Sequence, residues 1–155
     1  MRVNERAGIQ LTEVEAAQLL AECAKLTLAT VGRDGAPHLV TMFYALVDGR
    51  IAFWTYRTSQ KARNLERDPR LTCLVETGED YFTLRGVQVH GVAEPLDDPA
   101  AVADIGARVA ARSMNVAHEH VGEYVARAAP KRRGYLVTPT RLISWDHRKL
   151  AAGAR

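Results

Sequence analysis

Residues 25–56, KLTLATVGRDGAPHLVTMFYALVDGRIAFWTY, contain three runs of apolar and β-branched residues separated by two tight-turn signals. The runs are Lys25–Val31, His38–Val47 and Arg50–Tyr56. Asp34-Gly35 and Asp48-Gly49 lie between them, and an Asp-Gly pair readily adopts the positive φ angles of a tight hairpin. The stretch therefore predicts an antiparallel meander of three strands.

The second run, His38–Val47, is largely apolar on both of its alternating faces. A strand with one solvent-facing side would alternate between apolar and polar residues, so this strand needs cover on both faces. Closure of the barrel would bury one face of the strand, and a partner subunit or a bound ligand would bury the other. We therefore expect a homodimer formed largely through the barrel strands.

The remaining chain adds strands and helices to this meander. Thr12 and Glu15 form a capping-box pattern for an N-terminal helix, and Pro139 separates two closing strands. We expect one domain, 1–155, with mainly β structure and flanking helices, arranged as a closed or split antiparallel barrel. Its expected parts are an N-terminal helix in 1–24, barrel strands in 25–95 with a short helix at 59–67, a helical segment at 97–129, and closing strands in 135–147. Within these parts, strands are expected at Leu71–Glu76, Tyr81–Ala93, Tyr135–Thr138 and Leu142–Trp145.

Composition excludes several classes of protein. Of 155 residues, 47% are hydrophobic and 25% charged, which is typical of a globular domain. The 21 Lys+Arg against 18 Asp+Glu give a net charge of only +3, so a nucleic-acid partner is not expected. The chain has no signal peptide pattern and no apolar stretch of about 18 residues, so we expect a cytoplasmic protein without a membrane span. His118 and His120 would lie about 200° apart on a helix, so we expect no metal site.

Basic residues cluster where the third strand runs into the short helix. Arg57, Lys61 and Arg63 surround a helix start that already carries about half a positive charge, which disfavours cations by up to about 1 kcal/mol each. An anion among them removes this cost. Free backbone N–H groups, the hydroxyl of Ser59 and the three cations therefore predict a phosphate site. The alternative interpretation is a solvated basic helix with a serine N-cap.

Two strands beside this helix carry a surface suited to a planar ring. Thr41, Met42, Trp54 and Thr55 combine flat apolar area with few polar groups. Asn64 follows Lys61 by three residues, so it is expected on the same helix face, where it adds an amide donor. The sequence thus predicts a ligand with both a phosphate and a ring.

The chain resembles the flavin/deazaflavin oxidoreductase superfamily, which comprises the pyridoxamine 5'-phosphate oxidase-like, FMN-binding split β-barrels, and most of all its branch dependent on coenzyme F420. The resemblance spans nearly the whole chain in the order and spacing of its segments. These segments are Leu26–His38, Ser59–Leu65 followed by Asp68-Pro-Arg70, Val87–Pro95 with Gly91, and Pro139-Thr-Arg with Trp145-Asp.

This resemblance implies a homodimer with its cofactors in grooves at the subunit interface. Lys61 and Arg63 would hold the phosphate, and Ser59 and Arg57 would support it. Asn64 would orient the helix start or touch the ligand. The remaining implied contacts are Thr41, Met42 and Thr55 along the ring, chiefly through backbone groups, and Trp145, from either subunit, closing the pocket.

The implied activity is hydride transfer between F420 and a small conjugated or heteroaromatic substrate. The cofactor carries this chemistry and the protein supplies position and electrostatics, so no catalytic residue is named. Arg57, Arg63 or the Lys131–Arg133 segment would meet the acidic tail of F420. The alternatives are an FMN-dependent oxidoreductase of the same fold and a non-catalytic protein that binds flavin, F420 or haem.

Overall fold

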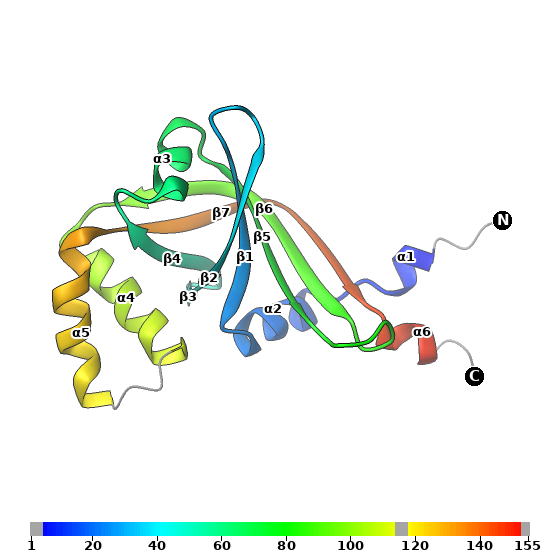
Figure 1. The fold of residues 1–155 in the computed structure, drawn as a ribbon. Coiled ribbons are helices and arrows are strands. Elements are labelled where there is room, and N and C mark those ends of the chain that lie inside the picture. Colours follow the sequence, from blue (N-terminus) through cyan, green and yellow to red (C-terminus); the bar gives the residue numbers. More distant parts are fainter. Residues whose placement is uncertain (1–4, 114–117, 153–155) are drawn as a thin grey trace.

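The structure is a computed structural model that describes residues 5–113 and 118–152 (Figure 1). Seven strands form one antiparallel sheet in the order β2-β1-β5-β6-β7-β4-β3. The strands are β1 Lys25–Val31, β2 Pro37–Phe43, β3 Ala45–Val47, β4 Arg50–Tyr56, β5 Arg70–Thr77, β6 Arg85–Leu96 and β7 Arg132–Asp146. The α-helices are α1 Glu5–Gly8, α2 Glu13–Glu22, α3 Gln60–Arg67, α4 Pro99–Ser113, α5 Val121–Ala128 and α6 Arg148–Ala152.

The sheet curls into a half-barrel, which confirms the predicted split β-barrel with flanking helices. Its inner face carries the main core, in which Leu28, Phe53 and Val75 are fully buried and α2 packs through Leu19. A second core lies between β4 and the helices α4 and α5, centred on Trp54. The two cores lie on opposite faces of β4, so this strand is buried on both sides, as its apolar sequence requires.

The prediction that His38–Val47 forms a single strand is wrong. The segment is split at Tyr44, where the chain leaves one edge of the sheet as β2 and joins the opposite edge as β3. The backbone N–H of Tyr44 donates to Ala24 O, and its buried hydroxyl donates to Leu20 O at 2.6 Å. These bonds fix the crossing point at the end of α2. The Asp48-Gly49 turn that follows has the predicted positive φ angles, 50° and 76°.

Two further strand boundaries differ from the expectation. Residues 81–84 form a turn instead of starting β6, because the Asp80 carboxylate accepts hydrogen bonds from the N–H groups of Phe82 and Thr83. The two expected closing strands are one continuous strand, β7, which passes through Pro139. Pro139 lies opposite Gly91 at a register shift in β6, where the missing N–H of proline does not interrupt a regular ladder.

The long strands β5, β6 and β7 run between two distinct ends of the molecule. In Figure 1, α4 and α5 pack beside β4 at one end, while the β5–β6 hairpin and the last part of β7 extend as an arm toward α1 and α6. Thr12 and Glu15 form the predicted capping box of α2. No helix in residues 5–113 or 118–152 has the length and apolar character needed to cross a bilayer.

Candidate functional site

A pocket of about 370 Å³ opens where the curled sheet fails to close. It lies between the end of β2 and the end of β4, beside the start of α3. In the described part of the chain, β2 pairs only with β1, and β3 pairs with β4 only as far as Ala52. Both strand edges therefore present unpaired backbone N–H and C=O groups to this opening. The residues that line it are Thr41, Met42, Phe43, Trp54, Thr55, Tyr56, Lys61, Val109, Ala110, Ser113, Tyr124 and Arg132.

Trp54 lines the pocket from the second core and is only 4% exposed. A Cβ atom at Gly106 of α4 would overlap its indole ring, so the glycine lets the helix approach closely. Tyr124 of α5 packs edge-on against the indole, with ring centroids 6.2 Å apart. Helices α4 and α5 thus hold the indole rigidly in a buried position.

The start of α3 supplies the polar end of the pocket. Ser59 is the N-cap, and its hydroxyl accepts from Ala62 N–H at 3.3 Å and lies 3.2 Å from the hydroxyl of Thr55. Lys61 follows in the first turn and lines the pocket. Partial burial, and then the nearby positive charge of Arg132, lower the pKa of Lys61 below its usual value. None of the lining residues is a carboxylate, so this end of the pocket is electropositive.

Arg132 also lines the pocket, whereas its segment, Lys131–Arg133, was expected at the acidic tail of F420. It begins β7 and pairs with Tyr56 of β4. Its guanidinium carbon lies 4.5 Å from the ring centroid of Trp54 and 4.3 Å from that of Tyr56. The pairing of β4 with β7 joins segments about 76 residues apart, so the sequence alone does not place Arg132 beside Trp54 and Lys61.

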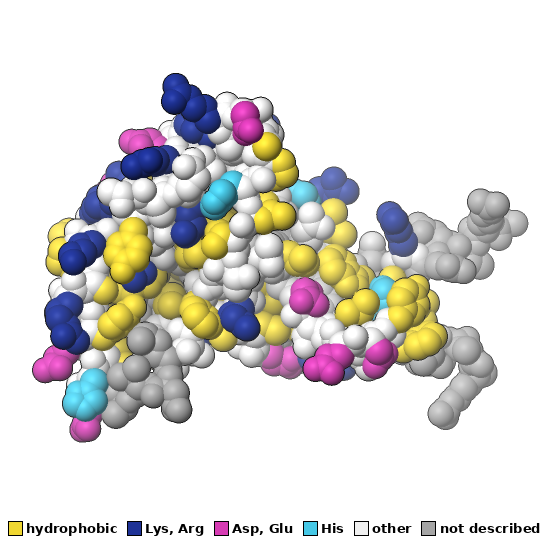
Figure 2. Space-filling view, in the orientation of Figure 1, with side chains coloured by type: hydrophobic (Ala, Val, Ile, Leu, Met, Phe, Trp, Pro, Cys, Tyr) yellow, Lys and Arg dark blue, Asp and Glu magenta, His cyan; other side chains and the backbone are white. Residues whose placement is uncertain are grey.

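Three of the predicted cationic contacts lie outside the pocket. Arg57 and Arg133 both donate to one carboxylate oxygen of Asp97, at 3.0 and 2.8 Å. Arg133, and then Arg57, lower the pKa of Asp97. Arg63 lies two residues after Lys61, about 200° around the helix, and is exposed. Figure 2 shows that basic side chains gather over α3, β4 and the α4–α5 end of the molecule.

Two other predicted residues have different surroundings from those expected. Asn64 is fully buried beneath α3, where its amide donates to Thr30 Oγ1 at 3.0 Å. It does not line the pocket. Trp145 lies in the arm, with its indole packed on Gly86 of β6, and it does not line the pocket of its own chain. Within one chain, the structure therefore brings together Thr41, Met42, Thr55 and Lys61, with Ser59 next to them.

Comparison with known proteins identifies the family. Residues 12–146 match the family described as pyridoxamine 5'-phosphate oxidase. The chain belongs to this family. A pyridoxine/pyridoxamine 5'-phosphate oxidase from Pseudomonas entomophila is 27% identical over 154 residues, covering 87% of this chain and 72% of that protein.

Solved structures agree with this assignment. A conserved hypothetical protein from Mycobacterium tuberculosis is 43% identical, with a TM-score of 0.88 over 94% of this chain and 91% of that one. A structure named F420 reductase has a TM-score of 0.62 at 23% identity, over 77% of this chain and 88% of that one, which is a likeness of fold. The resemblance to the flavin/deazaflavin split-barrel superfamily is confirmed.

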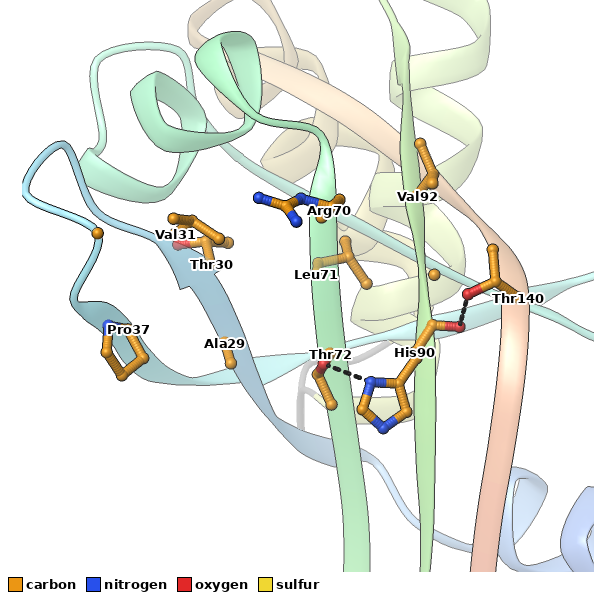
Figure 3. A pocket seen from close by; sticks show the side chains of 12 residues that line it. Ala29, Thr30, Val31, Pro37, Arg70, Leu71, Thr72, His90, Val92 and Thr140 are labelled. Atoms are coloured by element: carbon orange, nitrogen blue, oxygen red, sulfur yellow. Dashed lines mark hydrogen bonds between the residues drawn. The ribbon is translucent and has the colours of Figure 1, made fainter.

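This member of the pyridoxamine 5'-phosphate oxidase family has a second hollow, of about 640 Å³, on the outer face of β1, β5 and β6 (Figure 3). The His90 ring lies at the register shift of β6, 3.2 Å from the Thr72 hydroxyl through Nδ1. The cation at its rim, Arg70, is paired with Asp68 at 2.6 Å. Among the described residues, no helix begins at this hollow, and the charge of its cation, Arg70, is already paired with a carboxylate. The hollow therefore suits a phosphate less well than the pocket at α3.

Proposed function

We propose that the protein is an oxidoreductase that binds a phosphate-bearing flavin-type cofactor in the pocket between β2 and β4. The preferred cofactor is F420, and hydride passes between it and a small conjugated or heteroaromatic substrate. The observation that carries this proposal is that Lys61 and Arg132 line one pocket that no carboxylate of the described chain lines. F420 is placed above FMN because of the sequence resemblance, and FMN remains the alternative.

The residues of the pocket fit such a group. The Nε atom of Arg132 is buried and has no hydrogen-bond partner in the described chain, so an acceptor belongs near it. Lys61 supplies a second positive charge for the phosphate. The unpaired edges of β2 and β4 offer alternating donors and acceptors, which match the polar edge of a flavin or deazaflavin ring.

When bound, the cofactor supplies the hydride chemistry, and the chain controls position and access. Lys61 and the start of α3 would hold the phosphate end. Thr41, Met42 and Thr55, which line the same pocket, would contact the ring. No side chain is assigned as an acid or base, because position and electrostatics are what this reaction requires of the protein.

We further propose that the protein is a homodimer that associates through the outer face of β2, β1, β5 and β6. Leu39 and Phe43 of β2 are 63% and 47% exposed on this face. The outward residues nearest its centre, Ala29, Thr72 and His90, carry no carboxylate or ammonium group. Apolar side chains on an exposed edge strand favour association, and a second copy of the chain would bury them. Because β2 also borders the pocket, the partner would lie close to the cofactor.

Light scattering at micromolar concentration tests the dimer. We expect a mass of twice 17.1 kDa, and we expect Leu39→Glu to shift the protein toward the monomer because it buries an unpaired charge. Val14→Glu is the matched control, since Val14 is 67% exposed on α2, away from this face. A wild-type mass of 17.1 kDa would exclude the dimer.

The choice between F420 and FMN is tested by titrating both cofactors at low and high salt. F420 is expected to bind more tightly than FMN, and its affinity should fall with added salt and with a shorter acidic tail. The reason is that tail contacts with exposed cations are screened over about 8 Å at physiological ionic strength. Tighter FMN binding, or F420 binding that is independent of salt and tail length, would favour the flavin alternative.

A further inference from the structure

Arg132 is held in one place by aromatic rings on β4. Trp54 and Tyr56 are two residues apart on this strand, so their side chains lie on the same face, and the guanidinium of Arg132 lies over both. Cation–π contacts of this kind fix the plane of the guanidinium. Gly106 and Tyr124 in turn fix Trp54. The position of Arg132 therefore depends on packing that is present before any ligand binds.

The position of Arg132 along β4 places it at the phosphate end of the pocket. It pairs with Tyr56, the last residue of β4, and Arg57 N–H donates to Lys131 O at 3.1 Å. The α3 helix begins three residues later with its cap at Ser59. The guanidinium thus lies beside the strand–helix junction, and not at the Ala52 end of β4.

Arg132 and Lys61 form a pair of like charges in the same pocket. The positive charge of Arg132 contributes to the lowered pKa of Lys61, so the two groups interact. Two other cations, Arg57 and Arg133, share the Asp97 carboxylate outside the pocket, while none of the described carboxylates lines the pocket itself. Two cations in a partly buried site repel each other, and a bound anion that contacts both removes this repulsion.

We propose that Arg132 is a phosphate-positioning residue that makes the pocket select a phosphorylated cofactor over its phosphate-free ring. This inference rests on the proposed function. The guanidinium offers a planar fork of N–H donors to two phosphate oxygens, while Lys61 acts as a point charge on the same group. The fork would fix the orientation of a bound phosphate, and through it the position of the rest of the cofactor in the pocket.

The test compares each phosphorylated ligand with its phosphate-free ring, FMN with riboflavin and F420 with its deazariboflavin chromophore. Dissociation constants are measured by fluorescence titration for wild type, Arg132→Gln, Arg132→Lys and the exposed control Arg63→Gln. We expect Arg132→Gln to weaken the phosphorylated ligand by about 10- to 100-fold, with little change for the phosphate-free ring. Arg132→Lys should lose part of this affinity, and Arg63→Gln should retain the wild-type preference for FMN over riboflavin, a pair without an acidic tail.

An unchanged preference of Arg132→Gln for the phosphorylated ligand would overturn the inference, and so would an equal loss for both members of a pair. Melting temperatures measured without ligand identify any variant that fails to fold. If Arg132→Gln fails to fold, Arg132→Lys is compared with wild type in its place. If wild type binds neither FMN nor F420, the proposed function is wrong, and inorganic pyrophosphate decides the inference separately. Thermal stabilisation of wild type by pyrophosphate that Arg132→Gln lacks supports the phosphate role, whereas equal or absent stabilisation contradicts it.

Discussion

Lys61→Ala is expected to weaken cofactor binding by about 10- to 100-fold, which corresponds to the roughly 1.5–3 kcal/mol of a hydrogen bond to a charged group. Lys61 lines the pocket next to the cap of α3, and within the described chain it has no carboxylate partner. Its side chain therefore contributes little to the folded state, and the free energy of unfolding should change by less than about 0.5 kcal/mol.

Fluorescence titration with the preferred cofactor measures this effect, and thermal unfolding measures the stability. Arg63→Ala is the matched control in a parallel titration with FMN, which has no acidic tail, because Arg63 lies on the same helix with its side chain exposed outside the pocket. If Lys61→Ala binds the cofactor as tightly as wild type, the basic segment is a solvated helix face and not a phosphate site.

Asn64→Ala should have the opposite profile, with a large loss of stability and a smaller loss of affinity. The Asn64 side chain is 0% exposed. Its amide donates to Thr30 Oγ1, and its carbonyl oxygen accepts from Gln60 and Arg67 at 2.8 and 3.3 Å. Alanine leaves a cavity and a buried Thr30 hydroxyl without this partner, at a cost of about 2–3 kcal/mol.

For a chain of this length, such a change lowers the melting temperature by roughly 5–10 °C. Gln60→Ala provides a control on the same helix, since Gln60 is exposed and loses only one bond. Wild-type stability combined with a loss of cofactor affinity as large as that of Lys61→Ala would instead place Asn64 at the ligand.

The hairpins β1–β2 and β3–β4 could be predicted from the sequence because their turn signals are local, but the three-stranded meander that was expected to join them is wrong. Asp48-Gly49 forms the expected turn, and the Thr12–Glu15 capping box starts α2 as expected. The break at Tyr44 could not be predicted in this way. It depends on hydrogen bonds to Ala24 and Leu20, about 20 residues away, and no residue that usually breaks a strand marks it.

The same distinction applies to the candidate site. Thr55 and Lys61 could be predicted together because one strand–turn–helix segment carries both. Arg132 joins them only through the pairing of β4 with β7, which helical or strand periodicity does not reveal. Asn64 was expected near Lys61 from its spacing on the helix, but its short side chain points into the core, while the longer lysine reaches the pocket.

The central claim is that the pocket beside α3 binds a phosphate-bearing flavin-type cofactor. The most direct test is a parallel titration of the purified protein with F420, FMN and haem, followed by fluorescence quenching or absorbance. Our account predicts saturable binding of F420, with FMN weaker, at one cofactor per chain. Binding of haem alone, with no binding of F420 or FMN, would contradict it.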